Sequence, residues 1–360
     1  IDIKGFRMTE NKGFLNIMDS SVWGGMEQYV YDMSEELQRQ GVAPFVLTDM
    51  GNPNFINRYG EVATVLTIKL SKNSRYLYAN TVAKYIHENN IDTILCHTGK
   101  FILFALLLKK LTGVKVLFFK HNVLPAKTDI YHRWIQNQVD SFVCVSKCVY
   151  DAQVVKEKQE KYHLVYNGIN THRFPKVEVE QSQNGIFIVG YAGRISIDKG
   201  IMELLGAIKI LHEQGKNVEL HMCGGVSENT LSQIDEYIKS NHMKTYVKNL
   251  GFKKDVNQFY RFIDCLVVPS KIQEAFGLVI CEAMYCNTPV ITSTSGAQEE
   301  IITHGEDGLL LDTVTDTTIA NAIVYLMDNP AEYEKIRKKG YHRVESTFTI
   351  ENMVSSIKSL

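Results

Sequence analysis

Residues 265–284 read CLVVPSKIQEAFGLVICEAM and contain one complete strand–loop–helix pattern. Cys265–Pro269 is an apolar run of the kind that forms a buried strand, and Ser270–Gln273 is a short polar loop. Phe276-Gly277 then begins a segment with helical composition. A continuous apolar strand followed closely by a helix is typical of parallel sheets that are covered by helices on both faces. The stretch therefore predicts one βα unit of a doubly wound α/β domain.

The same unit recurs on both sides of this stretch. After the first apolar run, Met26, Tyr29, Val30, Met33 and Leu37 fall on one face of a helix. The strands predicted for the first half are Phe14–Met18, Pro44–Thr48, Val62–Ile68, Thr93–His97, Lys115–Phe119 and Ser141–Ser146. Those of the second half are Ile186–Ala192, Val218–Cys223, Val247–Leu250, Cys265–Pro269 and Val290–Ser293. The sequence thus predicts two doubly wound, Rossmann-like α/β domains with parallel sheets.

A polar segment separates the two series. Pro175–Gly185 (PKVEVEQSQNG) has no sustained period, which is typical of a linker. A chain of 360 residues also exceeds the size at which a single core keeps growing. We therefore predict domains at residues 1–175 and 186–346, with residues 1–7, which precede Met8, left out of the fold argument. The two helical patterns at the carboxyl end of the chain have no strand after them.

Composition narrows the class of protein. A formal net charge of −1 argues against a nucleic-acid partner, which usually meets a strongly basic face. The seven cysteines lie mostly in apolar runs without a C-x-x-C pair, which indicates buried thiols in a reducing compartment. The longest apolar run, Phe101–Leu108, is too short to span a bilayer. We expect a cytoplasmic location, with peripheral contact at the inner face of the cell membrane as an alternative.

Several common site motifs are absent from the sequence. It contains neither G-x-G-x-x-G nor G-x-x-x-x-G-K-[ST], and neither H-E-x-x-H nor G-x-S-x-G. No two aspartates are spaced as D-x-D to hold a divalent metal against a diphosphate. A phosphate ligand would therefore be held by backbone amides and cationic side chains.

Two glycine-bearing turns stand where a strand gives way to a helix. Gly24-Gly25 would let the backbone approach an anion, with free amides of the helix start behind it. A simple strand–helix turn is the alternative. In the second half, Arg194 and Lys199 of GRISIDKG can grip phosphate oxygens, although both could also be solvated surface charges.

Residues 265–284 also contain two candidate carboxylates, and two candidate histidines lie elsewhere in the chain. Glu274 lies just before the predicted helix, whose first amides can bind a phosphate, and Glu282 lies inside it among apolar residues. A carboxylate in such a setting needs hydroxyl or cationic partners, which a ribose or hexose would supply. At strand ends, His121 can hydrogen-bond a sugar hydroxyl, whereas a structural role is favoured for His97.

Together these motifs resemble the retaining glycosyltransferases with the GT-B fold, family 4 (glycosyl transferases group 1). The resemblance runs from about Phe14 to Phe348. The segments that carry it are GGxE at Gly24, His121-Asn122, VSK with Ser146, Tyr166-Asn167-Gly168-Ile169, AGR…DKG with Arg194 and Lys199, and EAFGLVICEAM.

The resemblance implies two domains that face each other across a cleft, the first on the acceptor side and the second binding the nucleotide-sugar donor. It also implies a final helix at about residues 347–360 that returns to the first domain. It implies that His121 touches the hexose near its reacting carbon and that Glu274 binds sugar hydroxyls. Glu282 would bind the ribose diol. The residues implied in catalysis are His121, Arg194, Lys199 and Glu274. Those implied in donor binding are Gly24, Gly25, Arg194, Lys199, Ala275, Phe276, Gly277, Leu278, Val279 and Glu282.

The expected reaction is metal-independent transfer of a hexosyl or N-acetylhexosaminyl unit from a nucleotide-diphosphate sugar, a UDP-sugar being favoured, to a hydroxyl acceptor. A nucleotide-sugar epimerase or hydrolase on the same fold is one alternative, and a non-catalytic glycosyltransferase partner subunit is another. A dehydrogenase is the weakest. The acceptor is not readable, although Lys69, Lys72, Arg75 and Lys84 with the aromatic segment Tyr76–Tyr78 could form a patch for a lipid-linked acceptor. A plain solvated face is favoured for that segment.

Overall fold

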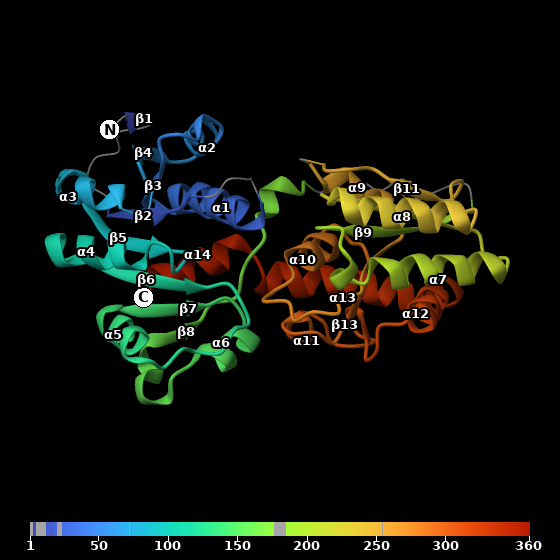
Figure 1. Ribbon diagram of the computed structural model, residues 1–360. Coiled ribbons are helices and arrows are strands. Elements are labelled where there is room, and N and C mark those ends of the chain that lie inside the picture. The colour runs from blue at the N-terminus through green and yellow to red at the C-terminus, as the bar shows by residue number, and fades with distance from the viewer. Residues whose placement is uncertain (1–2, 5–11, 20–23, 72, 176–184, 254) are drawn as a thin grey trace. The chain divides into compact units, whose positions relative to one another are not determined.

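The computed structural model describes residues 3–4, 12–19, 24–71, 73–175, 185–253 and 255–360 (Figure 1). Contacts divide the chain into two compact units. The first comprises Ile1–Tyr166 together with Ile350–Leu360, and the second comprises Asn167–Thr349. Each unit contains its own sheet and its own core, so each is considered by itself.

The first unit contains seven parallel strands in the order β4-β3-β2-β5-β6-β7-β8, with the short strand β1 antiparallel at the β4 edge. Their bounds are β1 Ile3–Lys4, β2 Gly13–Ile17, β3 Ala43–Asp49, β4 Thr64–Ile68, β5 Ile91–Cys96, β6 Lys115–Lys120, β7 Ser141–Cys144 and β8 Tyr162–Leu164. The strands β1 and β8 were not predicted, because two and three residues carry too little pattern to be recognised.

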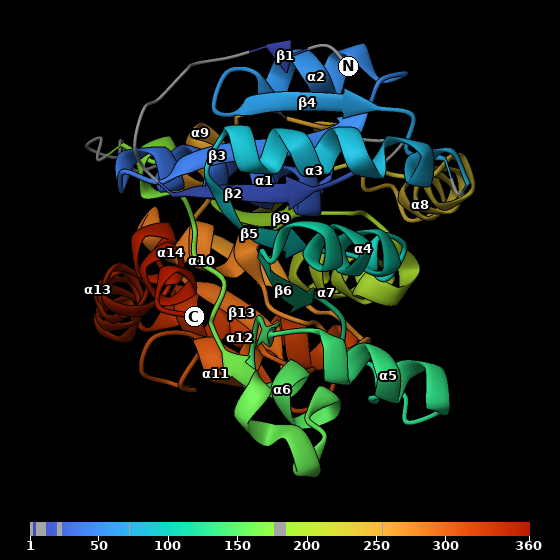
Figure 2. The same ribbon diagram turned by 90° about the vertical axis from the view of Figure 1, so that its left-hand side faces the viewer.

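Helices cover both faces of this sheet. They are α1 Gly25–Arg39, α2 Pro53–Tyr59, α3 Ala79–Glu88, α4 Ile102–Thr112, α5 Ile130–Gln138, α6 Lys147–Gln153 and α14 Ile350–Lys358. On one face, α1 packs with Leu95, Leu117 and Val143 of the strands. On the other, α3 lies beside α4 (Figure 2) and its Tyr85 meets the Phe45 ring of β3. Burial on both faces explains why the strands read as continuous apolar runs.

The last helix of the chain belongs to the first unit. Ile350, Met353, Val354 and Ile357 of α14 are buried in the same core as α1. Polar contacts add to this packing, since Gln40 at the end of α1 donates a hydrogen bond to the Glu351 carbonyl at 3.1 Å. The chain therefore enters the second unit and returns.

The second unit is a six-stranded parallel sheet in the order β11-β10-β9-β12-β13-β14. Its strands are β9 Phe187–Ala192, β10 Val218–Cys223, β11 Val247–Asn249, β12 Cys265–Val268, β13 Val290–Ser293 and β14 Leu309–Leu311. Its helices are α7 Ile201–Glu213, α8 Glu228–Ser240, α9 Asn257–Phe262, α10 Leu278–Tyr285, α11 Gln298–Ile301, α12 Asp316–Asp328 and α13 Pro330–Thr347. The predicted class of two doubly wound α/β domains is confirmed.

The division between the units falls between Tyr166 and Asn167, before the predicted linker. The segment after Asn167 already packs on the second unit: the Ile169 amide donates to the Phe348 carbonyl at 2.9 Å, and the Phe174 ring lies 6.3 Å from that of Tyr260. Most of the predicted linker, residues 176–184, lies outside the described residues.

None of the helices in the described part of the chain combines the length and the apolarity needed to cross a bilayer.

Candidate active site

The paired glycines stand at the beginning of α1. The Gly24 amide donates a hydrogen bond to the Glu27 carboxylate at 2.8 Å, so the glutamate of GGxE caps this helix. A Cβ built on Gly25 would meet no atom within 4 Å, which leaves room for an approaching ligand. Residues 20–23, which precede the glycines, lie outside the described residues. Gly24 and Gly25 stay predicted donor contacts.

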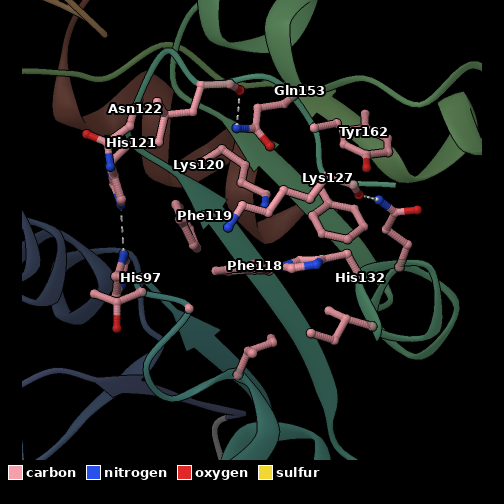
Figure 3. A pocket seen from close by; sticks show the side chains of 18 of the residues that line it. His97, Phe118, Phe119, Lys120, His121, Asn122, Lys127, His132, Gln153 and Tyr162 are labelled. Atoms are coloured by element: carbon pink, nitrogen blue, oxygen red, sulfur yellow. Dashed lines mark hydrogen bonds between the residues drawn. The ribbon is translucent and has the colours of Figure 1, made fainter. Parts of the chain in front are cut away.

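His97 and His121 follow the neighbouring parallel strands β5 and β6, so both rings lie at the same edge of the sheet. The His97 Nδ1 and His121 Nε2 atoms are 3.2 Å apart (Figure 3). On its other side, His97 Nε2 lies 2.9 Å from Oδ1 of Asn16 in β2. Asn16 and His97 are buried, and His121 is partly exposed. The structure thus gives His97 the positioning role and leaves His121 to face outward.

The orientation of the Asn16 amide sets the direction of this hydrogen-bond chain. With Asn16 oriented this way, its carbonyl oxygen can only accept, so His97 Nε2 carries the proton and His97 Nδ1 accepts from His121 Nε2. His121 Nδ1 is then a lone-pair acceptor. Burial lowers the pKa of His121 to about 4, and burial, with the neighbouring His121, lowers that of His97 well below its usual value. Both rings are therefore neutral near pH 7, and His121 Nδ1 can accept a hydrogen bond from a hydroxyl.

In the second unit, Lys199 and Glu274 come together from 75 positions apart. Lys199 ends a short turn of helix after β9, and its Nζ forms an ion pair with Glu274 Oε1. Both side chains are mostly buried, at 18% and 21% exposure. Arg194 is instead 65% exposed and pairs with Asp198 at 3.1 Å. The two predicted cations thus occupy different environments, one enclosed and one free to reorient.

The backbone of Glu274 is tightly fixed. Its amide donates to the Ser295 carbonyl at 3.1 Å, and its carbonyl accepts from the Ala297 amide at 2.9 Å. Gly296 between them has φ +84°, and a Cβ there would lie 2.4 Å from the Glu274 carbonyl oxygen. The Ser270 hydroxyl also donates to Glu274 Oε1 at 2.8 Å. The sequence analysis gave neither Ser270 nor Gly296 a role in the site. The available signal was the small polar residues that follow β12 and β13.

The helix α10 begins at Leu278, so the predicted start at Phe276 is wrong. Phe276 is buried with its ring 5.7 Å from that of Phe348, and Gly277 adopts an extended backbone that caps the helix. Among the described residues, the amides of Gly277, Leu278 and Val279 find no backbone acceptor. These amides and the helix dipole favour an anion at this end.

Glu282 has a partner within the protein. The hydroxyl of the buried Tyr260 donates to Glu282 Oε2 at 2.8 Å. Burial and, to a smaller extent, the Glu282 carboxylate raise the pKa of Tyr260, so its hydroxyl stays protonated and can donate. Tyr260 was not predicted, because no local pattern links α9 to a glutamate on α10.

Among residues 69–84 a plain solvated face was favoured over a basic–aromatic patch, and of the cations that the structure describes there Lys69 and Lys84 are exposed whereas Arg75 is buried. Arg75 is only 4% exposed; it donates to the Lys100 carbonyl at 2.8 Å and lies 5.1 Å from the Phe101 ring centroid. The Arg75 guanidinium is therefore held inside the first unit and does not form part of a surface patch. Leu77 is 85% exposed, and Lys72 lies outside the described residues.

Two family sequence models match the chain. One, described as Glycosyltransferase Family 4, matches residues 23–173, and the other, described as Glycosyl transferases group 1, matches residues 173–343. The chain belongs to the family 4, group 1 glycosyltransferases. The resemblance carried by the GGxE and EAFGLVICEAM segments is thereby confirmed.

Curated relatives match the chain over part of their own length. The capsular polysaccharide biosynthesis glycosyltransferase CapM of Staphylococcus aureus is 30% identical over 202 residues, 54% of this chain and 52% of CapM. The lipopolysaccharide 1,2-N-acetylglucosaminetransferase of Salmonella typhimurium is 31% identical over 173 residues, 45% of either chain. The chain thus spans about half the length of these two relatives.

Solved glycosyltransferases share the fold over nearly the whole chain. A glycosyltransferase from Rickettsia africae gives a TM-score of 0.84 at 20% identity, covering 97% of both chains. HepE from Anabaena, in complex with UDP-glucose, gives 0.76 at 19% identity, covering 97% of this chain and 100% of HepE. These likenesses confirm the GT-B fold class.

Proposed function

We propose that this glycosyltransferase moves a hexosyl or N-acetylhexosaminyl unit from a nucleotide-diphosphate sugar to an acceptor hydroxyl, with retention and without a metal. The observation that carries the proposal is the Lys199–Glu274 ion pair of the unit that also presents the unpaired amides of α10. The second unit would thus combine a cation for phosphate, a carboxylate for hydroxyls and the positive end of a helix.

The donor follows from these groups. The α10 amides and the exposed Arg194 favour a diphosphate, and Glu282 with its Tyr260 partner offers a carboxylate for a ribose diol. A UDP-sugar is favoured because HepE was solved with UDP-glucose and the pneumococcal O-GlcNAc transferase GtfA with UDP and GlcNAc. The names of CapM and the Salmonella enzyme support a role in bacterial cell-surface polysaccharide or glycoconjugate synthesis.

As the nucleoside diphosphate leaves, negative charge develops on its β-phosphate and must be stabilised. We infer that Lys199 exchanges part of its contact with Glu274 for a phosphate oxygen when donor binds, which leaves Glu274 for sugar hydroxyls. Arg194 and the α10 amides add preorganised positive potential. The acceptor oxygen then bonds to the anomeric carbon on the face that the phosphate leaves, and its proton passes to that phosphate. His121 contributes a neutral hydrogen-bond partner for a hexose hydroxyl. The absence of D-x-D from the sequence supports charge neutralisation by side chains and amides in place of a metal.

We propose a cytoplasmic location because the cysteines are free thiols and the proposed donor is a nucleotide sugar. Six of the seven cysteines are buried, as expected in a reducing compartment. Peripheral contact with the inner face of the membrane remains the alternative.

Product analysis tests the proposal. The chain would be incubated in EDTA with UDP-glucose or UDP-GlcNAc, first alone and then with a panel of saccharide acceptors. We expect an α-linked product from these α-donors that appears only with acceptor. An inverted product would contradict retention. Epimerised or hydrolysed donor as the main product, with or without acceptor, would support the alternative enzyme class, and no turnover with any donor would support the partner subunit.

A further inference from the structure

A group of small hydroxyl side chains joins the two loops that follow β12 and β13. These strands are parallel neighbours, so both loops leave the same edge of the sheet of the second unit. Ser270 follows β12 and is fully buried, and Ser293, which ends β13, is 3% exposed. The Ser293 hydroxyl donates to the Ser270 carbonyl at 2.6 Å. The backbone of Ser270 is therefore fixed to the neighbouring strand.

The second loop is held by a buried glutamine of α11. The Ser295 hydroxyl and the Ser295 amide both donate to Gln298 Oε1, at 2.7 Å and 3.2 Å. Gln298 is fully buried. The Ser295 carbonyl in turn accepts from the Glu274 amide at 3.1 Å. Since each serine hydroxyl has a single hydrogen, these contacts form a satisfied network in which every hydroxyl donates once.

The network ends at the carboxylate of Glu274. Its Oε1 atom accepts from the Ser270 hydroxyl at 2.8 Å and also forms the ion pair with Lys199. Within the described part of the chain, Glu274 Oε2 has no hydrogen-bond partner, and the side chain is 21% exposed. One carboxylate oxygen is thus held by the protein and the other is open to a ligand.

The two donors to Glu274 Oε1 differ in their freedom to move. Lys199 reaches the carboxylate with a flexible four-carbon chain that can turn to another anion. Ser270 has one rotatable bond to its oxygen, and its backbone is fixed to β13. Its hydrogen bond is charge-assisted, which makes it stronger than a bond between neutral groups. When Lys199 turns to a phosphate, Ser270 is the donor that stays.

We propose that Ser270 is a positioning residue, which keeps Glu274 in place for the transferred sugar while Lys199 binds the diphosphate. The inference rests on the proposed function, and it adds how the hydroxyl-binding carboxylate keeps its orientation once its cation is engaged elsewhere. Loss of the Ser270 hydroxyl should therefore weaken the contact with the sugar more than the contact with the nucleotide.

The ratio of the affinities for UDP-glucose and UDP isolates the sugar contact. Both would be measured by calorimetry in EDTA for the wild-type chain, Ser270→Ala and the control Thr292→Val. Thr292 is also fully buried, and its hydroxyl joins the same strands by donating to the Val268 carbonyl at 2.8 Å. We expect the ratio to fall roughly fivefold or more in Ser270→Ala, the scale for loss of one hydrogen bond to a charged group. The control should keep it within about twofold.

A merely structural role would lower both affinities alike and leave the ratio unchanged. An unchanged ratio in Ser270→Ala would therefore overturn the proposal, and so would an equal fall in Thr292→Val.

A double variant tests whether Ser270 acts through Glu274. In a Glu274→Gln chain, the further change Ser270→Ala should alter the ratio by less than about twofold, because the carboxylate that the hydroxyl positions is already gone. The same fall in both backgrounds would mean that the hydroxyl contacts the donor itself, which would overturn the positioning role.

Ser293→Ala provides a second route to the same question. It removes the 2.6 Å bond that fixes the Ser270 backbone and leaves both the Ser270 hydroxyl and Glu274 in the chain. It therefore reports on the network even if Ser270→Ala does not fold. A fall of roughly twofold to fivefold in the ratio is expected, smaller than for Ser270→Ala because the Ser295 hydroxyl also lies 3.1 Å from the Ser270 carbonyl. No change would overturn the network as the source of the positioning.

Denaturant unfolding without any ligand separates this inference from the proposed function. The effects of Ser270→Ala and Glu274→Gln on the unfolding equilibrium constant should fail to multiply by about threefold or more, because the two side chains share one hydrogen bond. If neither UDP nor UDP-glucose binds the wild-type chain while this coupling is present, the proposed function falls and Ser270 remains the residue that fixes Glu274. Independent effects of the two changes would overturn the inference itself.

Discussion

The two units present their functional side chains in opposite states. In the first unit, Asn16, His97 and His121 form a neutral, hydrogen-bonded chain that burial keeps uncharged. In the second unit, Lys199 and Glu274 are charged and paired with each other. From this difference we propose that the first unit orients a ligand through hydrogen bonds of fixed direction, whereas the second unit holds an ion pair whose contacts a bound ligand exchanges.

The largest expected effect follows from breaking the charged pair. Lys199→Met removes the enclosed cation and leaves Glu274 without its partner, so kcat/KM should fall by roughly 10²- to 10³-fold, the scale for loss of one preorganised transition-state donor. Thermal unfolding and circular dichroism would show that the fold persists. Lys209→Met on the surface of α7 is the matched control and should keep wild-type turnover. Near-wild-type turnover in Lys199→Met would remove the role assigned to the pair.

Arg194 tests whether an exposed cation of the same unit also acts. Arg194→Ala breaks only a surface ion pair, which contributes about 0–1 kcal/mol to stability. We nevertheless expect steady-state rates to fall by one to two orders of magnitude, because the guanidinium reaches the diphosphate when donor binds. Unchanged kcat and KM would mean that Arg194 is a solvated surface residue.

The fold class was predictable because it depends on local pattern, whereas much of the site was not. Runs such as Cys265–Pro269 indicate parallel strands wherever they occur. The partner of Lys199 lies 75 positions away and depends on how two loops are packed. Arg75 looked like a surface cation, but burial against Phe101 is a tertiary property. The start of α10 was misplaced because the extended backbone of Gly277 is invisible in composition.

Two glycines sharpen the comparison between the units. Gly296→Ala places a Cβ against the Glu274 carbonyl at a positive φ, so it should lower the free energy of unfolding by about 1–3 kcal/mol and reduce turnover. Gly25 is the first residue of α1 and a Cβ there would meet open space. Gly25→Ala should therefore change the free energy of unfolding by less than about 1 kcal/mol. If Gly25 approaches the donor, the same change should raise the KM for nucleotide sugar. Denaturant unfolding and donor titration of both variants would check this, and equal stability losses would contradict the assignment.

The neutral chain of the first unit predicts a pH effect on stability. Because burial lowers the pKa of His121 to about 4, the unfolded chain binds the proton more readily between pH 6.5 and 4. The stabilisation is therefore fully present above about pH 6.5 and is lost as pH falls toward 4. His121→Asn should flatten the dependence in that window by on the order of 2 kcal/mol. His87→Asn, a change of an exposed residue on α3, should leave it unaltered.

The smallest effect is expected at Tyr260. Tyr260→Phe removes one hydrogen bond to Glu282, so unfolding should become easier by about 1 kcal/mol. Affinity for the nucleotide should fall only a few-fold, since the carboxylate itself remains. Calorimetry with UDP would measure it, and a loss as large as that of Lys199→Met would mean that the ribose contact, not the charged pair, dominates the site.

The most direct test of the charged pair as a donor site is calorimetric titration of the chain with UDP-glucose in EDTA, repeated with Lys199→Met. The account predicts saturable one-site binding in the wild-type chain that weakens at least tenfold in the variant. Absence of binding in the wild-type chain, or equal affinity in both, would contradict it.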